Sequence, residues 1–280
     1  MFALLQLLVL FIGLSGYHGA HTHLLIKVHK PTSAMLHRFC HLNDERVASD
    51  FLADLHVQHY MPADIVEMPF RWCLPYSILH KDNLTTLWGN ESSIMHAKRW
   101  ELSGISELSF FAINFLANAS TLDFLWVIEQ DVAWQGNLFD ILATFATWTE
   151  DLLCLRPDVG RVGDSWGHSL THSGWANNTP GAPRPRCQVF VVRYSRRLLL
   201  TLVNEYLAKG HYAQVEWFAP TVCTLHMSNC TVRDYSTEQV FGRPFGCCET
   251  PYNETMWNYS LSHDASLFHP VKFLRKLVEQ

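Results

Sequence analysis

Two carboxylates follow a short apolar run near the middle of the chain: Glu129 and Asp131 stand directly after residues 124–128. On an extended backbone, side chains two residues apart point to the same side. Both carboxylates can therefore hold one divalent ion while Gln130 faces away, and Mg²⁺ and Mn²⁺ prefer oxygen ligands of this kind. The alternative is a solvated turn in which Asp131 caps a helix. The spacing alone leaves both interpretations open.

The elements around this pair predict where it lies. Residues 124–128 are continuously apolar and bounded by turn residues, which is typical of a strand buried on both faces of a parallel sheet. Open α/β sheets bind ligands at the carboxyl ends of such strands. Further strands are predicted at 24–28, 151–155 and 188–193, helices at 32–42, 93–116, 137–148 and 195–207, and a long loop at 164–186. The pattern predicts one α/β domain over residues 21–280, with a central, mostly parallel sheet and an irregular C-terminal part.

The segment Trp126-x-Ile-Glu129-x-Asp131-Val, with a glycine shortly after it, resembles the Asp-x-Asp type metal motif of A-fold nucleotide-sugar glycosyltransferases. The resemblance covers about residues 95–275 and includes the segments 98–100, 193–195, 211–221 and 269–272. It departs from the family pattern at Gln130, where family members often carry a second acid. The resemblance implies a single A-type glycosyltransferase-like, Rossmann-like domain.

The same resemblance implies ligands and partners. A nucleotide-sugar donor would bind with its diphosphate bridged by Mn²⁺ or Mg²⁺, and a glycan or glycoconjugate would accept the sugar. Glu129 and Asp131 would hold the metal, with Asp131 also a catalytic residue. A late-chain histidine would complete the metal shell, His269 first and His263 in reserve. Donor binding is assigned to Trp126, Glu129 and Lys272.

A further acid, Glu216, lies among apolar and aromatic residues in the segment 211–221. Desolvation there would raise its pKa toward the range useful for proton abstraction, so we predict Glu216 as the general base for the acceptor hydroxyl. A sugar could stack on Trp217. The alternative is an exposed or ion-paired Glu216 on an amphipathic helix, with Asp164 as a different base. The sequence does not decide between inverting and retaining transfer.

The N-terminus and the sequons predict a secretory protein. Residues 1–14 are almost entirely apolar, so we expect residues 1–20 to be a signal peptide. No Lys or Arg precedes the apolar run, which leaves a retained membrane anchor as the alternative. Acceptor sites for N-glycosylation occur at seven of the twelve asparagines, where chance would give about one or two: Asn83, Asn90, Asn118, Asn177, Asn229, Asn253 and Asn258. We expect an N-glycosylated protein in the ER or Golgi lumen, or a secreted one.

The eight cysteines agree with that compartment, because an even set in an oxidising lumen indicates a disulfide framework. Cys223 and Cys230 could close a short local loop, whereas the adjacent Cys247 and Cys248 should have separate partners. The net charge of −5 and the scattered basic residues argue against a nucleic-acid partner.

Two other classes of function stay open. One is a secreted glycan-binding or interaction protein that keeps the fold without turnover. The other is a metal-dependent hydrolase built on His168 and His172, which lack a third ligand at a convincing spacing. No P-loop or Gly-x-Gly-x-x-Gly motif occurs in the sequence.

Overall fold

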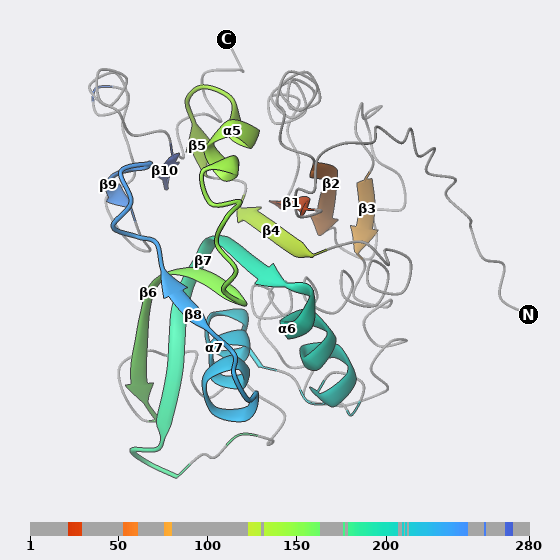
Figure 1. The fold of residues 1–280 in the computed structure, drawn as a ribbon, viewed down its shortest axis with the longest axis vertical. Helices are drawn as coiled ribbons and strands as arrows, with labels where there is room; N and C mark the ends of the chain where they lie inside the picture. Colours follow the sequence, from red (N-terminus) through yellow and green to blue (C-terminus); the bar gives the residue numbers. More distant parts are fainter. Residues whose placement is uncertain are drawn as a thin grey trace, which may run out of the picture.

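A seven-stranded sheet in the order β3-β2-β1-β4-β7-β6-β8 forms the centre of the computed structural model (Figure 1). The structure describes residues 22–29, 53–60, 76–79, 123–129, 132–162, 176, 179–206, 209, 211, 213–245, 255 and 267–270. The strands of the sheet are β1 (Thr22–His29), β2 (Ala53–Tyr60), β3 (Tyr76–Leu79), β4 (Phe124–Glu129), β6 (Leu152–Arg161), β7 (Pro183–Ser195) and β8 (Val232–Asp234). A second sheet joins β5 (Ala133–Trp134), β10 (Leu267–His269) and β9 (Phe241–Phe245).

Within the seven-stranded sheet, β7 is antiparallel to both of its neighbours and the other pairings are parallel. The predicted α/β class with a mostly parallel sheet is therefore confirmed. From β1 the chain adds β2 and β3 on one side and β4 on the other. The boundary between β1 and β4 is thus the point where the strand order reverses, and open α/β sheets usually bind ligands at the carboxyl ends of the strands at such a point.

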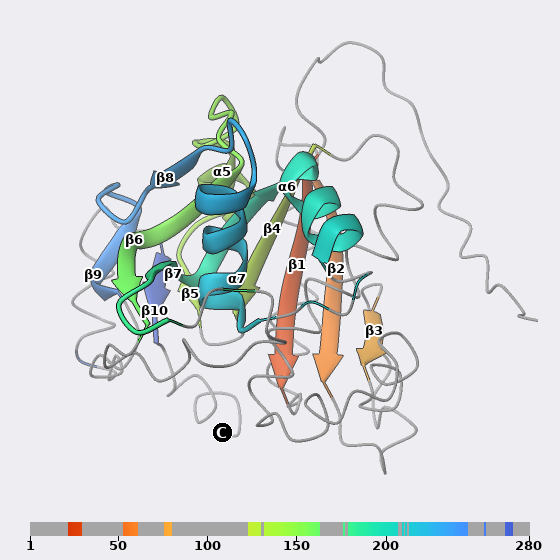
Figure 2. The same cartoon turned by 90° about the horizontal axis from the view of Figure 1, so that it is seen from below.

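Helices cover both faces of the sheet (Figures 1 and 2). Helix α5 (Leu138–Ala143) lies on one face, and α6 (Arg196–Thr201) and α7 (Val215–Thr221) lie on the other. The last two continue as π-helical turns, η1 (Leu202–Tyr206) and η3 (Val222–His226). Along β4, alternate residues enter the two cores, so the strand is buried on both sides. This explains the unbroken apolar run at 124–128.

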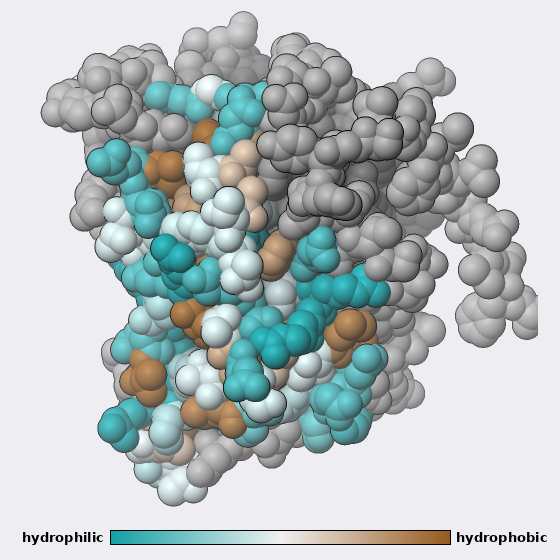
Figure 3. All heavy atoms as spheres, in the orientation of Figure 1, coloured by the Kyte–Doolittle hydropathy of each residue, from teal (hydrophilic) through white to brown (hydrophobic). Residues whose placement is uncertain are grey.

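On the face drawn in Figure 3, the apolar side chains of the described residues are scattered among polar ones. Among the large apolar side chains placed by the structure, Val159 and Leu225 are the exposed ones. Single exposed apolar residues are normal for a folded chain. In the parts of the chain that the structure describes, no helix has the length and apolar character needed to cross a bilayer.

Strand β7 begins at Pro183, so residues 183–186 belong to a strand and not to the predicted loop at 164–186. This first part of β7 pairs with β6 alone, because the pairing with β4 ends at Val191. A proline lacks an N–H group and is tolerated where one strand edge has no ladder partner. An ion pair of 2.9 Å between Arg186 and Asp158 holds the two strands together there.

Other sequence-based expectations have mixed outcomes. The strands at 24–28, 124–128 and 151–155 are present, and the helix predicted from 195 starts after Ser195, which caps it. The helix predicted at 137–148 is shorter, because α5 ends at Ala143 and gives way to turns. The predicted helices at 32–42 and 93–116 and the signal segment 1–20 lie outside the described residues.

The predicted local disulfide between Cys223 and Cys230 is present, and it closes a loop with a sequence separation of 7. Cys154 and Cys187 are buried free thiols on the sheet. Because they are free, this pair differs from the expected disulfide framework. Burial and the neighbouring Cys154 side chain raise the pKa of the Cys187 thiol well above its usual value. The other four cysteines lie outside the described residues.

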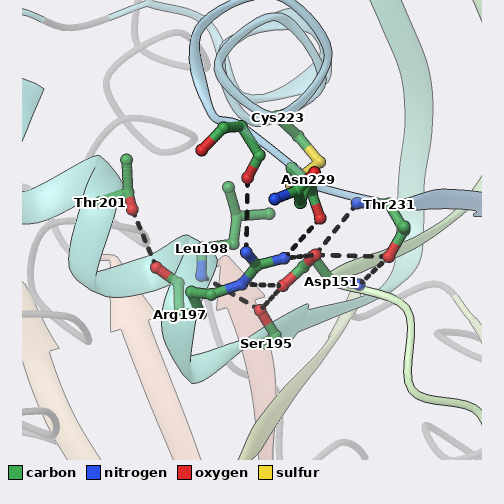
Figure 4. The surroundings of a disulfide bond; sticks show 10 residues. Asp151, Ser195, Arg197, Leu198, Thr201, Cys223, Asn229 and Thr231 are labelled. Carbon is green, nitrogen blue, oxygen red and sulfur yellow. Dashed lines mark hydrogen bonds and ion pairs between the residues drawn. A yellow bond between two sulfur atoms is a disulfide. The ribbon is translucent and has the colours of Figure 1, made fainter.

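A buried carboxylate, Asp151, joins the start of β6 to two other segments (Figure 4). It accepts hydrogen bonds from Ser195 Oγ at 2.7 Å, Arg197 Nε at 3.1 Å and the Thr231 backbone N–H at 3.0 Å. Ser195 Oγ in turn accepts from the Leu198 N–H at 3.1 Å and caps α6. One carboxylate therefore fixes the beginning of α6 and the chain after the disulfide to the central sheet.

We expect Asp151→Asn to lower the free energy of unfolding at pH 7 by about 2–3 kcal/mol, the worth of lost charge-assisted hydrogen bonds. Arg197 is half exposed and can be rehydrated, so the loss should not be larger. A matched control is Glu205→Gln, since Glu205 forms an exposed ion pair with Lys209 that is worth at most about 0.5 kcal/mol. Urea unfolding measures both variants.

The pH dependence has a definite sign. Burial alone would raise the pKa of Asp151, but hydrogen bonds from Arg197, Ser195 and Thr231 outweigh it and hold the pKa below its usual value. The stabilisation is therefore complete above the unfolded-state pKa of about 4 and is lost as the pH falls through the lower folded-state value. The difference in the free energy of unfolding between wild type and Asp151→Asn should therefore become smaller at acidic pH. If Asp151→Asn loses no more stability at pH 7 than Glu205→Gln does, Asp151 does not have the structural role assigned to it.

Candidate functional site

Glu129 is the last residue of β4, and its side chain emerges from the core where the strand ends. The preceding Ile128 is fully buried, whereas the Glu129 side chain is 27% exposed. Its register partner on β1 is Lys27, so Glu129 lies at the carboxyl end of the β1/β4 pairing. The Val132 N–H donates to the Glu129 carbonyl oxygen at 3.1 Å. The strand end thus places this carboxylate where the sequence predicted a ligand site.

His269 reaches the same place from the far end of the chain. Strand β10 pairs with β5 through Phe268 and Ala133, and β5 follows β4 almost directly. As a result, His269 Nε2 lies 3.9 Å from Glu129 Oε2. The imidazole is stacked on Phe190 of β7, with ring centroids 4.0 Å apart and an angle of 15° between the planes. The structure therefore brings two of the three predicted metal ligands together on a packed support.

The donor atoms of this pair suit a divalent ion. With metal–ligand distances of about 2.1 Å, one ion can contact two atoms up to about 4.2 Å apart, so the separation of 3.9 Å is compatible with a shared ion. A nitrogen beside an oxygen suits Mn²⁺ better than Mg²⁺, which prefers oxygen alone. No group of three His, Cys, Asp or Glu side chains gathers within the described part of the chain. Asp131, the third predicted ligand, lies outside it.

An aromatic cluster packs beneath the strand that carries Glu129. Trp126 is 1% exposed, and its ring lies 5.8 Å from Phe145 and 6.0 Å from Tyr235, centroid to centroid. The Tyr235 hydroxyl donates to the Val191 carbonyl oxygen and ties the cluster to β7. A side chain so enclosed can hold β4 in place, and the donor contact predicted for Trp126 stays a prediction.

A buried arginine strengthens the same support. Arg193 of β7 donates to the carbonyl oxygens of Phe145 at 3.0 Å and Trp148 at 2.8 Å, and its guanidinium lies 4.0 Å from the centre of the Phe124 ring. Burial lowers its pKa to about 10, so it stays charged at neutral pH. Neither its role nor the Phe190 stack was predicted, because both depend on which segments β7 meets.

Glu216 lies in the first turn of α7 and is 9% exposed. Its N–H donates to the side chain of Gln214, which caps the helix, and the next residue, Trp217, packs under the guanidinium of Arg184 at 4.5 Å. Helix α7 belongs to the core on the opposite face of the sheet from His269. The structure thus confirms that Glu216 lies among apolar residues on a helix, but no described contact links it to Glu129. Lys272, His263, Asp164, His168 and His172 lie outside the described residues.

Comparisons with known proteins give only distant likenesses. No protein-family model and no curated protein matches the chain. Among solved structures, a glycosyltransferase involved in the glycosylation of the major capsid of PBCV-1 has 10% identity and a TM-score of 0.41, over 89% of this chain and 91% of that one. Apo mouse xyloside xylosyltransferase 1 has 11% identity and a TM-score of 0.39, over 76% and 84%.

A third likeness is to a protein from Bacillus anthracis assigned as a glucose-1-phosphate thymidylyltransferase, in complex with sucrose. It has 10% identity and a TM-score of 0.37, over 76% of this chain and 86% of that one. Likenesses at this level do not decide the activity of this chain, which depends on its own residues.

We expect Glu129→Gln to weaken Mn²⁺ binding by at least about tenfold, because the amide keeps the shape of the side chain and removes the charged ligand. Titration calorimetry measures the affinity, and the melting temperature of the ligand-free variant checks the fold. Glu205→Gln is again the matched control, since Glu205 is exposed on η1, far along the chain from the pair. Equal Mn²⁺ affinity of Glu129→Gln and the control would exclude Glu129 as a ligand.

Proposed function

We propose that the chain is a metal-dependent glycosyltransferase of the secretory pathway, which moves a sugar from a nucleotide-sugar donor to a glycan or glycoconjugate acceptor. The observation that carries the proposal is the meeting of Glu129 and His269 at the carboxyl end of the β1/β4 pairing. Open α/β sheets bind their ligands there, and the motif at 126–131 resembles that of A-fold glycosyltransferases. The seven sequons and the apolar N-terminal run support the secretory location.

Glu129, Asp131 and His269 would hold Mn²⁺ or Mg²⁺ at this end of the sheet. When bound, the ion would neutralise negative charge on the diphosphate leaving group. The side chain of His269 is 5% exposed and stacked on Phe190, so its orientation is fixed before any ligand arrives. Preorganisation of this kind avoids a cost of ordering during the reaction. Lys272, three residues after His269, would add positive charge for the donor phosphates.

Glu216 is the proposed general base for the acceptor hydroxyl. A carboxylate enclosed by apolar side chains is a stronger base than one in water, because desolvation destabilises its charged form. An inverting transfer needs such a base, whereas a retaining one does not.

A thermal-shift screen of nucleotide sugars, with and without Mn²⁺, tests the proposed activity at the level of donor binding. A donor at a hundred times its Kd should stabilise the fold by about 2.7 kcal/mol. In Asp131→Asn this Mn²⁺-dependent shift should be lost while the ligand-free melting temperature stays the same. Asp123→Asn is the matched control, because Asp123 is exposed and lies just before the other end of β4.

The outcomes separate the classes of function. No Mn²⁺-dependent stabilisation by any nucleotide sugar would reject the glycosyltransferase proposal. Stabilisation without sugar transfer to any glycan acceptor would instead indicate a glycan-binding protein on the same fold.

We expect Glu216→Gln to leave donor binding intact and to lower the rate of sugar transfer by about two to four orders of magnitude. The pH profile of sugar transfer by the folded variant should also lack the rise at acidic pH that ionisation of the base causes, a change that a purely structural role would not produce. Near-normal transfer by the folded protein would reject Glu216 as the base and would favour a retaining mechanism or Asp164.

A further inference from the structure

One sequon has all three of its residues within the described part of the chain, and it coincides with a disulfide. Asn229 is the acceptor asparagine, Cys230 is the middle residue and Thr231 supplies the hydroxyl. Cys230 is bonded to Cys223, seven residues earlier. The segment is therefore both a potential glycan site and one end of a closed loop.

In the folded protein, backbone and side-chain groups of this sequon form hydrogen bonds with Asp151 and Arg197 (Figure 4). Thr231 Oγ donates to Asp151 Oδ2 at 3.3 Å and accepts from the Asp151 N–H at 3.3 Å, while the Thr231 N–H donates to the same carboxylate at 3.0 Å. The Asn229 carbonyl oxygen accepts from Arg197 Nη2 at 2.8 Å. Asn229 also has a φ of 57°, in the left-handed region. The folded chain thus fixes the backbone on both sides of Cys230.

A sequon is read as a pair, the asparagine amide and the hydroxyl two residues later. A transferase has to bind both groups, but in the folded protein the hydroxyl is bonded to Asp151 and the disulfide holds the residue between them. We propose that Asn229 is an N-glycosylation site that is open only before the Cys223–Cys230 bond closes, so that glycan attachment and disulfide formation compete. This inference rests on the proposed secretory location.

The competing steps use different atoms of one segment. In the first, the Asn229 side-chain nitrogen forms a bond to the anomeric carbon of a lipid-diphosphate-linked oligosaccharide, the bond from that carbon to the diphosphate oxygen breaks, and the nitrogen loses a proton. In the second, the two thiols lose two protons and two electrons to a protein or small-molecule disulfide, which is reduced to two thiols.

The sequence separation favours early closure. Short loops bring their ends together at little entropic cost, so Cys223 and Cys230 can meet without the rest of the core. Asn229 itself is exposed, so a glycan attached before closure can stay on the surface of the folded protein. Both products are compatible with the same fold, and we expect Asn229 to be only partly occupied.

Peptide mass spectrometry of the full chain, expressed in eukaryotic secretory cells, measures occupancy at each sequon. Cys223→Ala removes the partner of Cys230 and leaves Asn229-Cys230-Thr231 intact. We expect the occupancy of Asn229 to rise severalfold in this variant, while that of the other occupied sequons in the same molecules stays unchanged. Equal occupancy of Asn229 in wild type and Cys223→Ala would overturn the proposal.

A second variant separates the disulfide from folding in general. Trp126→Ala removes a large core side chain while both cysteines remain. If it raises the occupancy of Asn229 as much as Cys223→Ala does, slow folding and not the missing disulfide is responsible, and the proposal is overturned. If no sequon in any variant carries a glycan, the secretory location itself is wrong. If other sequons carry glycans but the occupancy of Asn229 does not change in Cys223→Ala, this inference alone is overturned and the secretory location stands.

Discussion

The burial of β4 on both faces is the constraint on which the rest of this structure depends. Because β1 and β7 flank the strand and a core covers each of its sides, the four residues 125–128 are buried and have to be apolar, and burial decreases again at Glu129. A charged side chain placed earlier on the strand would be buried without water, at a cost of several kcal/mol. The site is therefore located by where burial stops.

Contacts between distant segments complete the site around that strand. His269 depends on the pairing of β10 with β5, and its ring depends on Phe190 of β7 for a packed surface. Tyr235 and Arg193 secure the same region by hydrogen bonds to backbone carbonyl groups. A buried polar group bonded in this way resists displacement, because leaving its partner unsatisfied costs about 1–3 kcal/mol. The geometry of Glu129 and His269 is thus maintained by residues that do not belong to the pair.

Local patterns in the sequence were sufficient for some of these features and not for others. The strand at 124–128, the start of the helix at 195 and the short disulfide loop follow from periodicity, side-chain chemistry and spacing within a few residues. The start of β7 at Pro183, the Asp151 network and the Phe190 stack depend on partners far along the chain. Propensity and periodicity are silent about such partners, since they are set by the strand order.

The irregular pairing between β6 and β7 has a consequence for how the chain can vary. Leu153 of β6 pairs with Arg193 of β7, and the next register pair joins Leu155 to Gln188. A step of two residues along β6 therefore corresponds to a step of five along β7. An irregularity of this kind anchors the alignment of two strands, because a slip by one residue would turn every following side chain to the other face. Phe190 would then leave His269, and Cys187 would leave the core under α7. Insertions should therefore be excluded from this part of the β6/β7 pairing, however conservative the inserted residue.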